Sequence, residues 1–259
     1  TKNAAEYSLN VTIYDWDDTL CPSTWLLMQE LLMKATGYNE MNDEYTTSLF
    51  TTMQSCIVQN IIAAKEQGPV AIITNGYKEW VRQAASRLMP GLLQHLEAIE
   101  IISAQELYSG VSDDPFVWKQ LAFLEYAASQ FAGHEGRLRT LISVGDSCAE
   151  RRALVDVAAR LPGTPIAIKS VKMAERPTLE DLALQLGQLA GGGLGALYAA
   201  ETNQDLAFEK GELVPYSPPA AIEGRSRGKR RRLKGQDKTQ DAQRSVAQGD
   251  QRVGVDSTL

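Results

Sequence analysis

Long apolar segments, cysteine and histidine are scarce in this chain, and each scarcity narrows the kind of protein to expect. No apolar run approaches the roughly 18 residues that a membrane helix needs, so we expect no membrane partner. The 259 residues contain three cysteines and two histidines. The cysteines lack the spacing of a zinc site, and their odd number is typical of a reducing compartment. We therefore expect a cytoplasmic or nuclear protein.

The composition is otherwise that of an ordinary globular chain. Hydrophobic residues make up 44% of it, and the length is enough for one sizeable domain or two small ones. The formal net charge of -6 argues against a protein that binds nucleic acid over its whole surface. Residues 1–10 show no pattern of a secretory leader, so we expect none.

Strand-like and helix-like segments alternate through residues 10–189, which we interpret as one domain. Such alternation predicts an α/β fold, a doubly wound parallel sheet of about five strands with helices on both faces. Phe50, Met53, Ile57 and Ile61, for example, recur at helical spacing. We expect strands at 11–16, 69–74, 98–103, 140–144 and 165–169, and helices at 25–35, 44–64, 77–88, 116–131, 149–161 and 177–189.

The composition changes after Leu189. Glycine-rich sequence comes first, and the remainder is rich in Gly, Ser, Gln, Asp and Arg with little apolar periodicity. We expect 190–259 to be a flexible, largely disordered tail. Within it, 225–234 reads RSRGKRRRLK, in which seven of ten residues are basic. Such runs are typical of nuclear import signals or nucleic-acid contacts, and the alternative is a solvated tail without function.

The stretch Val11–Leu20, VTIYDWDDTL, carries the strongest chemical signal. An apolar strand leads directly into Asp15, Asp17 and Asp18. Packed carboxylates repel, and burial raises their pKa unless a cation or hydrogen bonds favour the charged form. Carboxylates at the end of a strand are suitable ligands for a hard cation such as Mg²⁺. The alternative is a polar turn after a strand.

Further polar residues occupy matching positions along the predicted sheet. Thr74 ends the second strand in IITNG, Asp146 follows the fourth strand in ISVGDSCAE, and Glu150 lies one helical turn later. Lys119 lies in the helix that leads into the fourth strand. Ligands of open parallel sheets bind outside the carboxyl ends of the strands, where the strand order reverses. We therefore expect Asp15 and Asp146 to face one another there.

In these features the chain resembles the haloacid dehalogenase superfamily. Its four motifs are matched in order over about residues 10–188, by Asp15, Asp17 and Thr19, by Thr74, by Lys119, and by Gly145, Asp146 and Glu150. The resemblance implies a Rossmannoid sheet with strand order 3-2-1-4-5. Since room for an inserted domain is small, it also implies a capless or minimally capped enzyme with an open site.

The resemblance further implies the role of each residue. Asp15 would be the nucleophile that forms an aspartyl-phosphate, and Asp17 the acid and then the base. Thr74 would contact the phosphoryl group, and Lys119 would neutralise charge beside Asp15. Mg²⁺ would be bound by Asp15, Asp146 and the backbone carbonyl of Asp17, with Glu150 linked to it. Dehalogenases of the superfamily lack the second acid, so Asp17 argues against dehalogenation.

Some of these residues have a second interpretation. Ser147 and Glu150 also match a capping box at the start of a helix. Lys78 could replace Lys119, although it lies too close to Thr74 for the spacing of the superfamily. Asn75 and Gly76 could bind phosphate through amides after Thr74, or could form a plain turn.

The expected function is hydrolysis of a phosphate monoester, with Mg²⁺ as cofactor and a phosphorylated substrate as partner. A narrower alternative is a phosphatase for polynucleotide ends or phosphoproteins, because an open site admits large substrates. An import receptor or nucleic acid would be the partner of the basic run. An alternative of another class is a non-catalytic scaffold or binding protein with the same fold.

Overall fold

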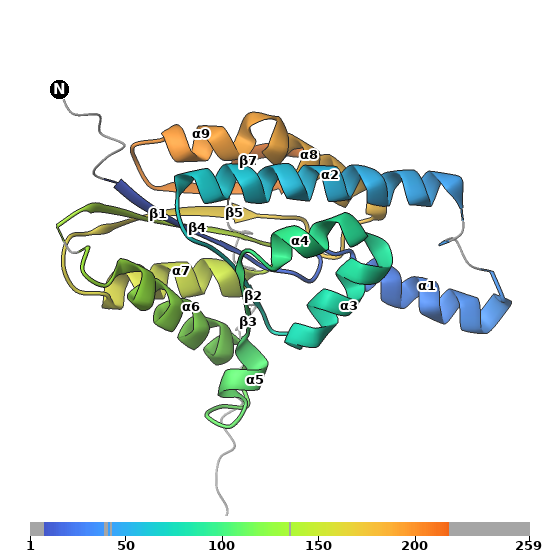
Figure 1. Cartoon of the computed structure of the whole chain (residues 1–259), viewed down its shortest axis with the longest axis horizontal. Helices are drawn as coiled ribbons and strands as arrows, with labels where there is room; N and C mark the ends of the chain where they lie inside the picture. The colour runs from blue at the N-terminus through green and yellow to red at the C-terminus, as the bar shows by residue number, and fades with distance from the viewer. Residues whose placement is uncertain (1–7, 39–40, 42, 135, 218–259) are drawn as a thin grey trace, which may run out of the picture. The chain divides into compact units, whose positions relative to one another are not determined.

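The computed structural model describes residues 8–38, 41, 43–134 and 136–217, which fold as alternating strands and helices (Figure 1). Seven strands form one sheet in the order β3-β2-β1-β4-β5-β6-β7. They are β1 (Ser8–Tyr14), β2 (Val70–Thr74), β3 (Glu100–Ser103), β4 (Leu138–Gly145), β5 (Ile166–Lys172), β6 (Gln204–Glu209) and β7 (Glu212–Pro215).

The sheet is parallel except at one edge, where β6 and β7 pair in antiparallel fashion. The predicted α/β class and mostly parallel sheet are thus confirmed. The prediction of about five strands in the order 3-2-1-4-5 was wrong for the sheet as a whole, because β6 and β7 extend it beyond β5.

Nine α-helices occur in the described part of the chain. They are α1 (Ser23–Thr36), α2 (Glu44–Gln67), α3 (Lys78–Leu88), α4 (Leu93–Leu96), α5 (Ala104–Tyr108), α6 (Pro115–Phe131), α7 (Cys148–Arg160), α8 (Leu179–Gln188) and α9 (Leu194–Ala199). A 3₁₀ turn (Pro90–Leu92) precedes α4, and a π-helical turn (Leu189–Gly193) joins α8 to α9. None of these helices combines the length and apolar character needed to cross a membrane.

Alternate residues of the central strands point to opposite faces of the sheet, and each face has its own apolar core. Tyr14, Ile72 and Val144 pack on one side with residues of α2, α3, α8 and α9. Val11, Ile13 and Ile73 pack on the other side with residues of α6 and α7. Figure 1 shows α2, α8 and α9 along one face and α6 and α7 along the other. Nearly continuous apolar strands are what a sheet buried on both faces requires.

Side-chain caps fix the beginnings of several helices. Asp43, Asp114 and Thr178 each accept a hydrogen bond from a backbone N–H in the first turn of α2, α6 and α8. Such caps satisfy amide donors that have no partner within the helix. Pro115 follows Asp114 at the first position of α6, where its missing N–H costs nothing.

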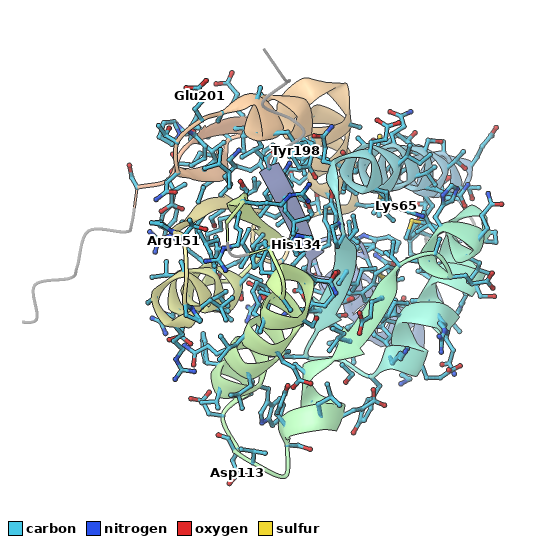
Figure 2. The ribbon with its side chains drawn as sticks, turned by 60° about the vertical axis from the view of Figure 1, so that its left-hand side comes forward. Lys65, Asp113, His134, Arg151, Tyr198 and Glu201 are labelled. Carbon is cyan, nitrogen blue, oxygen red and sulfur yellow. The ribbon has the colours of Figure 1, made fainter. Side chains whose placement is uncertain are left out.

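Residues 190–217 contradict the prediction of a flexible tail. Gly192 has φ of 128° and belongs to the π-helical turn, which leads into α9. Tyr198 of α9 points back toward β1 (Figure 2), and its hydroxyl lies 2.8 Å from the hydroxyl of Thr12. Lys169 of β5 donates to the carbonyl oxygens of Leu197 and Ala200 at the end of α9, over 2.6 and 2.8 Å. Residues 218–259, including the basic run 225–234, lie outside the described residues.

Candidate active site

The predicted polar residues meet at the carboxyl ends of β1, β2 and β4. Asp15 directly follows β1, Thr74 is the last residue of β2, and Asp146 directly follows β4. The parallel register pairs Tyr14 with Val144, and the backbone N–H of Asp15 donates to the carbonyl of Val144 over 2.9 Å. The sheet itself therefore positions Asp15 and Asp146 beside one another, in the crevice where the strand order reverses.

Lys119 connects three parts of this site. Its side chain is only 2% exposed, and its Nζ lies 2.6 Å from Asp15 Oδ1 and 2.9 Å from Glu150 Oε1. The same ammonium donates to the carbonyl of Ile73 in β2 over 3.0 Å. The two carboxylates raise the pKa of Lys119, against the effect of its burial, so the side chain stays charged. The structure thus places Lys119 beside Asp15, as the resemblance implies. Lys78 instead contacts Glu106 through its backbone N–H.

Glu150 bonds to the chain through both carboxylate oxygens. Oε1 pairs with Lys119, and Oε2 accepts from the backbone N–H of Ser147 over 3.1 Å. The Ser147 side chain completes the predicted capping box of α7. A Cβ at residue 145 would lie 2.5 Å from Glu150 Cγ, so Gly145 is needed for this fold-back. This geometry confirms the capping box and gives both carboxylate oxygens a protein partner, and the link of Glu150 to a metal stays a prediction.

Asp15 and Asp146 are poorly compensated carboxylates. Burial raises the pKa of Asp15 above its ordinary value, although Lys119 opposes the shift. Burial and the charges of Asp15 and Glu150 raise the pKa of Asp146 to about 8. Lys172 donates to the backbone carbonyl of Asp146 over 2.9 Å. The charged forms of both carboxyls are therefore disfavoured in the absence of a cation, and a bound cation would stabilise them.

Asp17 is held by three hydrogen-bond donors, and Lys119 is not one of them. The indole N–H of Trp80 donates to its Oδ1 over 3.0 Å, and the Ser23 hydroxyl donates to the same oxygen. The Thr74 hydroxyl donates to Oδ2 over 3.1 Å. The sequence identified Thr74 but not Ser23 or Trp80. Each lies in the first turn of a helix that follows a motif strand. No residue pattern reveals which side chain of that turn reaches Asp17.

In the predicted phosphate loop after β2, the donors of Asn75 and Gly76 bond to protein acceptors. The N–H of Gly76 donates to the Thr74 hydroxyl over 2.9 Å, and the Asn75 side chain donates to the carbonyl of Pro115 over 3.2 Å. A Cβ at residue 76 would lie 3.1 Å from Asp17 Oδ2, so glycine allows the loop to approach the site. Asn75 joins this loop to α6, and the Gly76 amide would have to leave Thr74 to bind a phosphate.

Asp18 determines where α1 begins. Its φ of 53° is in the left-handed region, which is uncommon for a residue other than glycine. This conformation turns the carboxylate toward Thr24, whose backbone N–H donates to Oδ1 over 2.8 Å and whose hydroxyl donates to Oδ2. Since α1 has no other side-chain cap at its first turn, Asp18 supports the helix that carries Ser23.

A magnesium ion would fit the donors of this site. In residues 8–217 with the gaps given above, no three His, Cys, Asp or Glu side chains are grouped closely enough to hold a metal. Mg²⁺, however, keeps several water ligands and is usually bound by one or two carboxylates together with phosphate oxygens of a substrate. Asp15 and Asp146 supply such a pair, with the backbone carbonyl of Asp17 as the further predicted ligand.

Comparison of the chain with family models, with curated proteins and with solved structures gives no match. The functional argument therefore depends on the residues at the strand ends. They place a charged lysine against a buried carboxylate and a second carboxylate against three donors. Such a site can pair a nucleophilic carboxylate with a separate acid and base.

Proposed function

We propose that the chain is a Mg²⁺-dependent phosphatase that hydrolyses a phosphate monoester through an aspartyl-phosphate at Asp15. The observation that carries this proposal is the 2.6 Å contact between Lys119 and Asp15 at the end of β1. A buried ion pair contributes little net stability, so such a pair at a strand end is better explained by chemistry than by folding. The order of the four motifs supports the same function by resemblance.

In the first step, an Asp15 oxygen attacks phosphorus and the bond between phosphorus and the ester oxygen breaks. Lys119 holds Oδ1 of Asp15 by an ion pair, which orients the carboxylate and leaves Oδ2 to attack. The backbone N–H bond to Val144 fixes the position of Asp15 at the end of the strand. Phosphoryl transfer depends mainly on such positioning and on charge stabilisation.

Asp17 serves the leaving group. In its protonated form it donates a proton to the ester oxygen as the alcohol departs, and it then accepts a proton from the water that attacks the aspartyl-phosphate. The second step releases phosphate and restores Asp15. The contacts from Ser23, Trp80 and Thr74 hold the Asp17 carboxylate in one orientation. The mechanism requires the ester oxygen to lie next to Asp17 and in line with the attacking oxygen of Asp15.

Positive charge near the transferred group comes from two sources. Lys119 remains charged because two carboxylates face it. Mg²⁺ held by Asp15 and Asp146 would add charge that stabilises the phosphoryl oxygens, an effect worth several kcal/mol. The Thr74 hydroxyl and the Gly76 amide, which bond to one another beside Asp17, would be the neutral donors for those oxygens.

Release of inorganic phosphate tests this proposal. A panel would contain a phosphosugar, a nucleotide, a phosphopeptide and an oligonucleotide with a 3′-phosphate. We expect the wild type to hydrolyse at least one member with Mg²⁺ and to stop when the ion is chelated, and Asp15→Asn to be inactive but folded. Turnover that survives excess chelator, or equal turnover by folded Asp15→Asn, would reject the proposal. A scaffold would give no turnover on any member.

A further inference from the structure

A groove lies between α1 and α3, next to the proposed active site. It encloses about 690 Å³, which is within the usual size range of small-molecule pockets. Most of its walls are apolar and come from Leu26, Leu27 and Met33 of α1 and from Trp80, Ala84 and Leu88 of α3. Figure 1 shows α1 extending away from the sheet beside α3. Large apolar side chains along an open groove are typical of ligand sites.

The groove begins beside Asp17, the proposed general acid of the site. Ser23 and Trp80 are both lining residues, and both donate to Oδ1 of Asp17. Neither Lys119 nor Asp15 lines the groove. The groove is therefore connected to the active site through the two residues that hold Asp17, the proposed acid for the departing ester oxygen.

We propose that this groove holds the leaving group, and that the substrates are phosphate monoesters with an extended apolar leaving group. This inference deepens the proposed function and rests on it. A chain that starts at an oxygen beside Asp17 would run along α1 between apolar walls. Burial of its methylene groups would supply binding energy that a small alcohol lacks.

The charged lining residues lie at the far end of the groove. Lys34 is eleven residues beyond Ser23, which corresponds to about 16 Å along a helix. Lys34 pairs with Glu30 over 2.5 Å, and Arg87 of α3 also lies near Glu30 and lowers the pKa of its carboxyl. The groove thus runs from Asp17 to this charged group, with Met33 beside Lys34. This length is suited to an alkyl chain of several carbons or to fused aromatic rings.

Ethyl phosphate and hexyl phosphate test the inference, because their leaving alcohols differ in length but hardly in acidity. Leu27 and Met33 line the groove and are 56% and 51% exposed, so Leu27→Gln with Met33→Gln can be made without opening the core. The matched control is Met28→Gln with Leu31→Gln. These residues are 58% and 51% exposed on the same helix but do not line the groove.

We expect wild-type kcat/KM to be at least about tenfold higher for hexyl than for ethyl phosphate, given the burial of four further methylene groups. The double variant Leu27→Gln with Met33→Gln, the groove pair, should reduce that preference to less than about threefold. The double variant Met28→Gln with Leu31→Gln, the control pair, should keep it. Equal kcat/KM for the two esters in the wild type, or equal loss of preference in the two double variants, would overturn the inference.

Two further measurements separate other outcomes. If the wild type hydrolyses neither ester nor any member of the panel, the proposed function fails. Calorimetry would then compare the affinities of the two esters. Tighter binding of hexyl than of ethyl phosphate, lost when Leu27 and Met33 are replaced, would still support an apolar ligand groove. Equal affinities would overturn it. Sedimentation tests a second copy of the chain as occupant. A wild-type dimer that dissociates in the groove pair, together with no preference for chain length, would overturn the inference.

Discussion

Lys119 and Asp15 are 104 residues apart in the chain, yet Lys119 Nζ lies 2.6 Å from Asp15 Oδ1 in the buried centre of the molecule. The same lysine also pairs with Glu150 and donates to the carbonyl of Ile73. One ammonium therefore joins α6 to the ends of β1 and β2 and to the start of α7. Its loss should affect both folding and chemistry.

Lys119→Met should lower the free energy of unfolding by about 3–5 kcal/mol, because it leaves two buried carboxylates without their partner. Lys34→Met is the matched control, since its pair with Glu30 is 68% and 60% exposed, and it should change the free energy of unfolding far less. Urea unfolding followed by circular dichroism measures both. A loss in Lys119→Met no larger than in Lys34→Met would contradict the buried pair.

The raised pKa of Asp146 predicts a pH dependence of stability without metal. Its folded-state pKa of about 8 exceeds the ordinary value of 3.8. The folded state therefore binds the proton more tightly, and stability should fall as pH rises from about 4 to about 8. Asp15 shifts in the same direction, whereas the lowered pKa of Glu150 acts below this window.

Thermal melts between pH 4 and pH 8 check this prediction. In chelator the melting temperature should fall over that range, and Asp146→Asn should show a shallower slope. Saturating Mg²⁺ should raise the melting temperature of the wild type at pH 8 more than that of Asp146→Asn, because ligands that bind the folded state stabilise it. The same slope in both proteins, or no effect of Mg²⁺ on the wild type, would count against the assignment of Asp146.

Trp80→Phe should impair the acid step while leaving nucleophilic attack in place. It removes the 3.0 Å bond to Asp17 Oδ1, and hydrogen bonds to charged groups are worth about 1.5–3 kcal/mol. We expect kcat to fall about tenfold for an alkyl phosphate and clearly less for 4-nitrophenyl phosphate, whose leaving oxygen needs less protonation.

Trp118→Phe provides the comparison, because the indole of Trp118 donates to the carbonyl of Ser112 and not to Asp17. It should change kcat for the two esters by a common small factor. If Trp80→Phe also lowers both rates by the same factor, Trp80 does not act through the leaving group.

Truncation should show that residues 203–217 contribute to the thermal stability of the domain. The prediction of a flexible tail was wrong for these residues. Asp205 of β6 forms an ion pair with Arg151, and the side chains of Ala207 and Phe208 are buried. A chain that ends at Thr202 should melt several degrees below one that ends at Ser217, because it loses β6, β7 and that pair. Equal melting temperatures would show that the two strands contribute nothing to stability.

The sequence allowed the first five strands and the longer helices α1, α2, α3, α6, α7 and α8 to be predicted because their apolar patterns are regular. The short helices α4, α5 and α9 were not predicted. The strand β1, for example, was expected at 11–16 and lies at Ser8–Tyr14. The strands β6 and β7 were missed because they have six and four residues and follow a glycine-rich run. Their stability comes from pairing with β5, which a local pattern does not show.

The candidate site likewise has residues that the sequence predicts and contacts that it does not. Asp15, Thr74 and Asp146 could be predicted because parallel strands end at the same edge of a sheet. The contacts of Ser23 and Trp80 with Asp17 could not, since they depend on how α1 and α3 pack, and no spacing in the chain encodes that. Glu150 shows the reverse case, because its capping box is a local pattern and was confirmed, whereas its link to a metal was only implied by resemblance.

The most direct test of the account is capture of phosphate on Asp15. The protein would be mixed with Mg²⁺ and 4-nitrophenyl phosphate, whose leaving oxygen needs little protonation by Asp17. It would then be quenched in acid within one turnover, digested and analysed by mass spectrometry. Asp17→Asn should accumulate the intermediate, because it lacks the base that activates water for the second step. We expect one phosphoryl group on the peptide that contains Asp15 in this variant, and none when Asp15→Asn is added. Continued turnover with no phosphoryl group on that peptide, or phosphate on another residue, would contradict the proposed mechanism.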